Sequence, residues 1–247
     1  MRPSPAARVP RRSLLTATAL LTAVVATIAG PRTAHAQILR IDGPREPFAW
    51  VGGGLGYTQF SRVVYDGATQ SAWRFGGGVR YQASIEKSIS NQSSLGLTGS
   101  YGRMPLRYYD LSSSVLDLLD PRSACQGNSG CRAHAQVGSL GVGFHAGGGG
   151  GIHQVIEGAA GVTRYSNFEQ DGSATKLGAT ANVDGSLTVG YGVGYTLNRA
   201  MQFTVVQDYS AILHDRKDLP SGQSALAQTY TTRLSVRLGI GSRRSGI

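Results

Sequence analysis

The sequence predicts an all-β protein, a single eight-stranded antiparallel up-and-down β-barrel that spans a membrane. Three observations carry this prediction. Eight segments alternate apolar residues with polar or glycine residues, their connections are alternately short and long, and no segment after the N-terminal one is long and apolar enough for a membrane-spanning helix. Lipid admits only helices and closed sheets, because it offers no hydrogen-bonding partner to an open backbone.

The stretch DGSLTVGYGVGYTL at 184–197 shows the alternation most clearly. Every second residue from Leu187 to Tyr195 is large and apolar, and the residues between them are threonine or glycine. A β-strand sends successive side chains to opposite faces, so this stretch has one apolar face and one polar or empty face. Two environments fit that pattern: a sheet over a protein core, and a barrel with lipid outside and polar groups inside.

Eight segments follow this period of two, and no comparable segment shows the 3.6-residue period of a helix. The segments are 47–60, 71–86, 93–109, 133–147, 152–167, 176–197, 200–213 and 228–241. In the second segment we expect Trp73 and Phe75 on the outward face, with Trp73 in an aromatic girdle, and Arg74 on the inward face. The one helical candidate is SSVLDLLD at 113–120, which we place in a loop over the barrel mouth.

The lengths of the connections separate the two environments. The short ones are KSISNQ, the glycine run 147–151 and TLNR, and the longer ones are 61–70, 110–132, 168–175 and 214–227. Tight turns at one end and long loops at the other are typical of transmembrane β-barrels. A soluble sandwich has no reason to sort its loops in this way. With the N-terminus in the periplasm, the long loops face the cell exterior.

The N-terminal region has the pattern of an export signal. Four arginines precede the apolar run Leu14–Ala29, and small residues at Ala34 and Ala36 provide a cleavage site before Gln37. The run is shorter than the ~20 residues that a spanning helix needs. The expected division is a signal peptide at 1–36, a periplasmic segment at 37–46 and the membrane barrel at 47–247.

Charge and composition disfavour a nucleic-acid partner. The formal net charge is +10, but five arginines lie in the signal, which has no acidic residue, so the exported chain carries +5. That chain has no basic run. The 35 glycines are about twice the average share, and they cluster inside the alternating segments, which indicates a crowded or curved wall.

Cys125 and Cys131 stand close together in CQGNSGC. In an exported protein a local disulfide is the default expectation for such a pair. Zinc binding with His134 is the alternative, although two thiols and one histidine fall short of a four-ligand structural site.

On these segments and loops the chain resembles the eight-stranded outer-membrane barrels of Gram-negative-type bacteria, namely the OmpA-like, OmpX-like and OmpW-like barrel domains. The resemblance covers nearly all of 37–247 and is one of pattern. It implies location in the outer membrane, contact with lipid and lipopolysaccharide, and insertion by the barrel-assembly machinery. Such proteins usually end in an aromatic residue, whereas this chain continues past RLSVRLGI into GSRRSGI.

An eight-stranded barrel encloses space for side chains or one small ligand. Charged residues of the inward series must therefore pair or stay hydrated, because an isolated ion in a low dielectric is very costly. The expected lumen network consists of Arg74, Arg80, Glu157, Asp184, Asp208, Arg233 and Arg237. We expect this network to plug the barrel.

A structural or surface-interaction role without enzymatic activity is the expected function. A narrow, porin-like channel or carrier for small or hydrophobic solutes is the alternative, followed by a soluble periplasmic ligand-binding barrel. A lipid-modifying enzyme is disfavoured, because His145 is followed by Ala146 and Gly147 and forms no His-x-Ser motif. The glycine run 147–151 lacks the Lys-Ser/Thr of a phosphate loop. We expect no cofactor and no metal.

Overall fold

The structure is a computed structural model, and it describes 47–111, 125, 129–173, 176–177, 182–215 and 225–241. The predicted signal peptide 1–36, its cleavage site between Ala36 and Gln37, the segment 37–46 and the helical turn 113–120 lie outside these residues. Within the described ranges, no helix has the length and hydropathy that crossing a bilayer requires.

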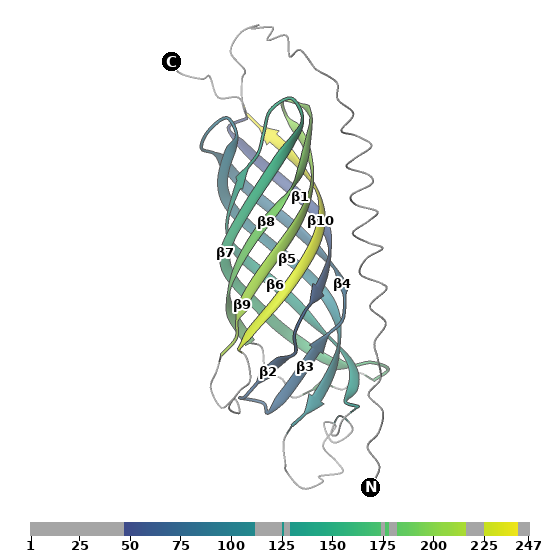
Figure 1. Ribbon diagram of the computed structural model, residues 1–247. Coiled ribbons are helices and arrows are strands. Elements are labelled where there is room, and N and C mark those ends of the chain that lie inside the picture. The colour runs from purple at the N-terminus through teal and green to yellow at the C-terminus, as the bar shows by residue number, and fades with distance from the viewer. Residues whose placement is uncertain are drawn as a thin grey trace, which may run out of the picture. The chain divides into compact units, whose positions relative to one another are not determined.

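The described residues form a closed antiparallel barrel (Figure 1). The strands are β1 (Ala49–Phe60), β2 (Val64–Asp66), β3 (Ser71–Phe75), β4 (Gly78–Ser88), β5 (Ser93–Asp110), β6 (Cys131–Ala146), β7 (Gly151–Gln170), β8 (Asn182–Asn198), β9 (Met201–Leu213) and β10 (Leu226–Ile240). Each strand from β4 to β10 pairs with the next, and β1 pairs with both β4 and β10, which closes the ring. The prediction of an eight-stranded antiparallel barrel is confirmed.

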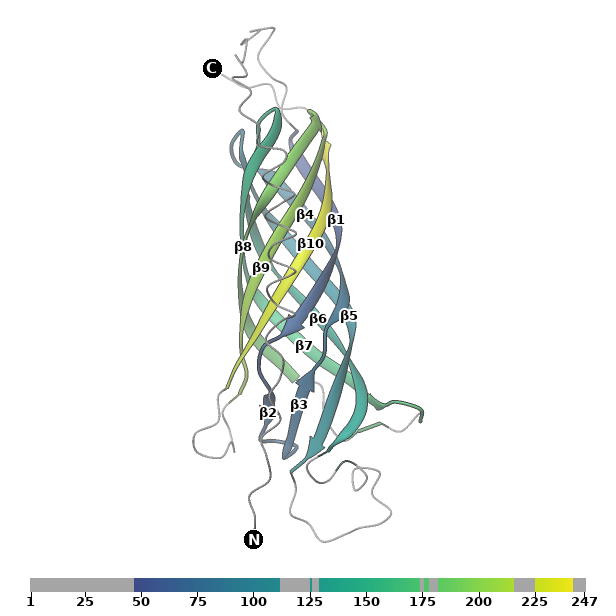
Figure 2. The same cartoon turned by 45° about the vertical axis from the view of Figure 1, so that its right-hand side comes forward.

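The barrel has a short-turn end and a long-loop end. The connections β4–β5, β6–β7 and β8–β9 lie at the short-turn end, and the others lie at the long-loop end. At the long-loop end, drawn at the bottom of Figure 2, β3 and β5 continue past the end of β1. The predicted segments match the strands closely, except that 71–86 is divided between β3 and β4. In addition, β8 begins at Asn182, and Lys176 forms only an isolated bridge with Glu169.

The division between β3 and β4 is a β-bulge at Gly76 and Gly77. Phe75 pairs with Leu106, and Tyr81 pairs with Tyr101, so this side uses six residue steps where β5 uses five. One extra residue exchanges the inward and outward series, because side chains alternate with a period of two.

The exchange overturns three predictions made for this segment. Trp73 and Phe75 point inward and are buried, whereas Arg74 is exposed on the outer face. Trp73 therefore belongs to no outer girdle, and Arg74 belongs to no lumen network. The outward series resumes after the bulge, with Val79, Tyr81 and Ile85 exposed.

Along β6 the polarity of both faces inverts at one level. Nearer the short turns the outward residues are Leu140, Val142 and Phe144, and nearer the long loops they are Arg132, His134 and Gln136. The inward series changes in the opposite sense, from Ser139, Gly141, Gly143 and His145 to Ala133, Ala135 and Val137. β5 inverts at the paired position, where outward Tyr101 is followed by Arg103, and inward Gly102 by Met104.

An apolar band therefore surrounds the outside of the barrel. Its exposed members include Val51, Leu55, Val79, Tyr81, Ile85, Leu95, Leu97, Leu140, Val142, Ile156, Val162, Leu187, Val189, Leu234 and Leu238. Leu140 is 61% exposed and Leu187 is 59% exposed. Soluble proteins rarely show contiguous apolar surface of this extent, so the surroundings of this band are apolar.

The interior toward the long loops is filled by an apolar cluster, which we call the apolar plug. Its members are Val64, Trp73, Phe75, Met104, Leu106, Tyr108, Cys125, Cys131, Ala133, Ala135, Val137, Tyr165, Phe168, Leu177, Ile212 and Ala227. Trp73 is fully buried, with its ring centroid 4.5 Å from that of Phe168 and 5.7 Å from that of Tyr165. Its Nε1 donates a hydrogen bond to Ser71 Oγ at 2.8 Å.

A second bulge brings Phe168 into the apolar plug. His134 pairs with Glu169 and Gln136 pairs with Ser166, so β7 uses three steps where β6 uses two. Asn167 lies between them with φ of 51°, in the left-handed region that asparagine tolerates better than most residues. Both bulges thus turn large aromatic side chains inward at the level where the outer surface becomes polar.

Deleting Gly76 tests the role of the first bulge. Without the extra residue, Trp73 and Phe75 must either face outward or lose their register with β5. We expect the free energy of unfolding to fall by about 5 kcal/mol, because two aromatic side chains leave the interior. The measurement is urea unfolding of the refolded barrel in detergent, followed by the gel-mobility difference between folded and heat-denatured protein. Gly76→Ala keeps the residue count, its Cβ would meet Pro105 no closer than 3.4 Å, and it should unfold as the native chain does.

Candidate functional site

The candidate site is the lumen at the level of the apolar band. Five of the predicted network residues point into it, namely Arg80, Glu157, Asp208, Arg233 and Arg237. Asp184 is also buried, but it lies beside the apolar plug. Arg74 is the exception on the outer face, because the bulge at Gly76 and Gly77 reverses its direction.

Arg233 of β10 is the centre of the first group of lumen contacts. Its Nε donates to Asp208 Oδ2 at 3.0 Å, one terminal nitrogen donates to Ser235 Oγ at 2.8 Å, and the other donates to Glu157. The second Glu157 oxygen lies 2.9 Å from His145 Nδ1. These contacts join β10, β9, β7 and β6 across the lumen, and one guanidinium contacts two carboxylates.

Arg237 lies four residues beyond Arg233 on β10, nearer the short turns, and is the centre of a second group. Its terminal nitrogens donate to Gln202 Oε1 at 2.7 Å, Glu86 Oε2 at 2.5 Å and Ser94 Oγ at 2.7 Å. The guanidinium carbon lies 4.9 Å from the centroid of the Trp50 ring, a cation–π arrangement. We did not predict Glu86 as a member of the network, although it belongs to the same inward series of β4 as Arg80 and the pattern could have identified it.

Arg80 makes hydroxyl contacts in the lumen. Its terminal nitrogen donates to Ser100 Oγ at 2.5 Å and to Ser139 Oγ at 3.3 Å. Glycines on the wall provide the room for these long side chains. Gly190, for example, stands directly opposite Asp208, and a Cβ at that position would collide with the Asp208 carboxylate. A Cβ at Gly192 would collide with the Val205 backbone, and one at Gly194 with the His153 ring, so each of these alternating glycines stands at a close approach.

Asp184 and His214 form a buried pair at the edge of the apolar plug. Asp184 Oδ2 lies 2.6 Å from His214 Nδ1, and each side chain is 2% exposed. The ring centroids of Trp73 and Tyr165 lie 5.6 Å and 6.4 Å from that of His214. His214 was not predicted as a partner, because it follows the last residue of β9. Continuing the even-numbered inward series of that strand by one step would have placed it inside.

Two cavities lie along the lumen and at its short-turn end. A cavity of about 120 Å³ lies between the charged groups, and a vestibule of about 610 Å³ opens at the short-turn end, lined by Trp50, His145, Gln202 and Arg237 among others. The apolar plug lies toward the long loops. The two groups of charged contacts and the apolar plug thus follow one another along the lumen.

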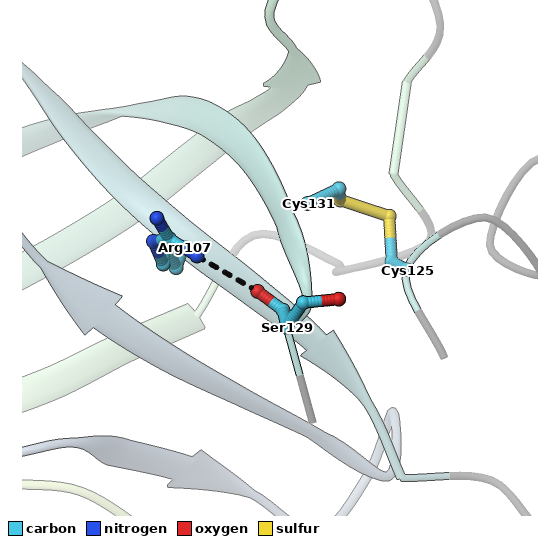
Figure 3. The surroundings of a disulfide bond; sticks show 4 residues. All are labelled: Arg107, Cys125, Ser129 and Cys131. Carbon is cyan, nitrogen blue, oxygen red and sulfur yellow. Dashed lines mark hydrogen bonds between the residues drawn. A yellow bond between two sulfur atoms is a disulfide. The ribbon is translucent and has the colours of Figure 1, made fainter. Parts of the chain in front are cut away.

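The predicted disulfide between Cys125 and Cys131 is present (Figure 3). It overturns the zinc alternative, because oxidised sulfurs are not thiolate ligands. His134 lies on the outer face, with its ring nitrogens 2.9 Å from Glu169 Oε2 and 2.9 Å from Asp171 Oδ1. Within the described part of the chain, no three metal-ligating side chains come together in a metal-binding arrangement.

No protein-family model matches the sequence, and no curated protein matches it. Solved barrels resemble the fold. The structure of Neisserial surface protein A is 12% identical, with a TM-score of 0.46, and covers 78% of this chain and 97% of its own. OprG from Pseudomonas aeruginosa is 12% identical, with a TM-score of 0.43 and coverage of 82% and 98%. Ail of Yersinia pestis, solved with a heparin analogue, is 13% identical, with a TM-score of 0.39 and coverage of 78% and 99%. Likeness at this level says nothing about a shared activity.

Arg233→Met tests whether the lumen contacts stabilise the barrel. Removing the guanidinium leaves Glu157 and Asp208 buried without their counter-charge. Breaking a buried ion pair in this way costs about 3–5 kcal/mol, and we expect a loss of that size in the free energy of unfolding, measured by urea titration in detergent.

The matched control replaces the whole group, as Arg233→Met with Glu157→Gln and Asp208→Asn. Because no uncompensated charge remains, this triple variant should recover most of the lost stability. A single variant as stable as the native chain would show instead that lumen water solvates these carboxylates.

Proposed function

We propose that this chain is an integral β-barrel protein of the bacterial outer membrane, with a structural and surface-interaction role. The observation that carries the proposal is the inversion of polarity at a common level on β5 and β6. On the short-turn side of that level these two strands are apolar outside and polar inside, as a wall in lipid must be. On the long-loop side they are polar outside and apolar inside, as a wall in water must be.

The proposed role is non-conducting and non-enzymatic. The apolar plug closes the long-loop half, and the contacts of Arg233 and Arg237 cross the lumen nearer the short turns. A small solute entering from the vestibule meets both barriers. The long loops would then provide the contacts with other molecules, and the lipid and lipopolysaccharide of the outer membrane would surround the band. Assembly would require the barrel-insertion machinery, and nucleic acid has no part in this proposal.

Location is tested by fractionation and surface proteolysis. We expect the protein in the outer-membrane fraction, with a gel mobility that heating changes. Protease added to whole cells should cut within 110–132 or 214–227, and it should spare the connections at the short-turn end. Recovery in the soluble periplasmic fraction would contradict the proposal and favour a soluble ligand-binding barrel.

Conductance tests whether the lumen is closed. Purified protein in a planar bilayer should show no steady openings, because solute passage requires displacement of the apolar plug. Steady openings in the native chain would favour the narrow channel for small solutes. A variant that lacks plug aromatics, Trp73→Ala with Phe168→Ala, controls for insertion, since transient openings should appear in it while the native chain stays silent.

A further inference from the structure

On the outer face of the long-loop half, three arginines stand side by side. Arg74 of β3 pairs directly with Arg107 of β5, and Arg107 pairs directly with Arg132 of β6. All three are exposed on the outer face, and we call them the arginine row. We propose that the arginine row binds the phosphorylated saccharide headgroup of the lipid that surrounds the barrel. This inference rests on the proposed location in the outer membrane.

The arginine row is a charge arrangement that a strand ladder ordinarily avoids. Neighbouring strands lie about 4.8 Å apart, so the three side chains start within about 10 Å of one another. Like charges directly opposite each other destabilise a sheet. A bound anion would remove this repulsion, and no fold requirement demands arginine at these outward positions.

The described acidic side chains nearest on the same face, Glu169 and Asp171, contact other residues. Glu169 and Asp171 contact His134, and Glu169 also lies 3.9 Å from Arg103. Within the described ranges, no carboxylate forms an ion pair with a member of the arginine row. Among the described residues, Arg107 donates a hydrogen bond from Nη1 to the Ser129 carbonyl at 3.0 Å (Figure 3). A guanidinium has five donors, so this bond orients Arg107 and uses only one of them.

The height of the arginine row selects the kind of anion. Arg107 lies on the outward series of β5, six residues beyond Tyr101, which is the last exposed apolar residue of the band on that strand. For a strand tilted by about 40°, six residues correspond to roughly 15 Å. The row therefore faces the headgroup layer and not the acyl chains. Guanidinium groups bind phosphate in a bidentate manner, and three of them in a line suit a saccharide that carries more than one phosphate.

Thermal unfolding in detergent tests the proposal. The probe is rough lipopolysaccharide that retains its phosphorylated inner core, and the variant is Arg74→Gln with Arg107→Gln and Arg132→Gln. Because a ligand that binds only the folded state stabilises it, the probe should raise the unfolding midpoint of the native chain. We expect the apparent Kd of the variant to be at least about tenfold weaker, since it loses several charge-assisted hydrogen bonds. Added salt should weaken the native binding.

Three controls distinguish the sources of the effect. Arg199→Gln removes an exposed charge at the short-turn end and should bind the probe as the native chain does. The same lipopolysaccharide after removal of its phosphates should bind no better to the native chain than to the row variant. Inorganic phosphate alone should give no shift at the probe concentration, because it cannot span the row.

Two outcomes would overturn the proposal. One is equal binding of the probe by the native chain and the row variant. The other has two parts: without the probe the row variant is less stable than the native chain, and the probe does not shift the unfolding midpoint of the native chain. That result would show that an acidic residue of the chain itself pairs with the arginine row. Asp117→Asn with Asp120→Asn identifies that case, since it would lower stability in the same way. The assay uses purified protein, so it can fail while fractionation still places the barrel in the outer membrane.

Discussion

The structure depends on one constraint: in a closed ring of strands, successive side chains must alternate between the lumen and the outside. Once β1 pairs with both β4 and β10, every strand residue faces either the lumen or the surroundings, and within an unbroken run of a strand odd and even positions take opposite faces. A one-residue insertion is then the local means of exchanging the two series. The bulges at Gly76–Gly77 and Asn167 are such insertions, and both stand where the outer surface changes from apolar to polar.

One narrow interior is filled in two different ways along its length. At the level of the band, the outside is apolar, and the lumen holds arginine, carboxylate and hydroxyl groups that form ion pairs and hydrogen bonds with one another. Toward the long loops, the outside is polar, and Trp73, Tyr165 and Phe168 pack as the core of a soluble protein does. The Asp184–His214 pair lies at the transition between these two fillings, buried against aromatic rings.

The alternation of apolar and polar residues was sufficient to predict the number of strands, the sorting of the loops and the inward position of Arg233 and Glu157. It failed for Trp73, Phe75 and Arg74, because a bulge changes the parity without changing the local composition. The adjacent glycines Gly76 and Gly77 were the available signal, since glycine in a strand often marks a bulge. Periodicity could also have placed Glu86 and His214 inside the barrel. Which residues they contact there depends on the strand register, and periodicity alone does not give the register.

At the long-loop end the barrel wall extends beyond the apolar band, and this explains why the outer face of that extension can carry arginines that repel one another. β5 and β6 continue into water as a two-sided wall, and the apolar plug stabilises that wall from within. The Cys125–Cys131 disulfide lies in the neighbourhood of Arg107 (Figure 3), and the Ser129 carbonyl accepts a hydrogen bond from Arg107 Nη1. Because the interior packing stabilises this wall, the outward side chains do not have to pack against the fold. The residue types at these outward positions therefore depend on what lies outside the barrel. A row of three arginines at that height is therefore informative about the surroundings and not about the fold.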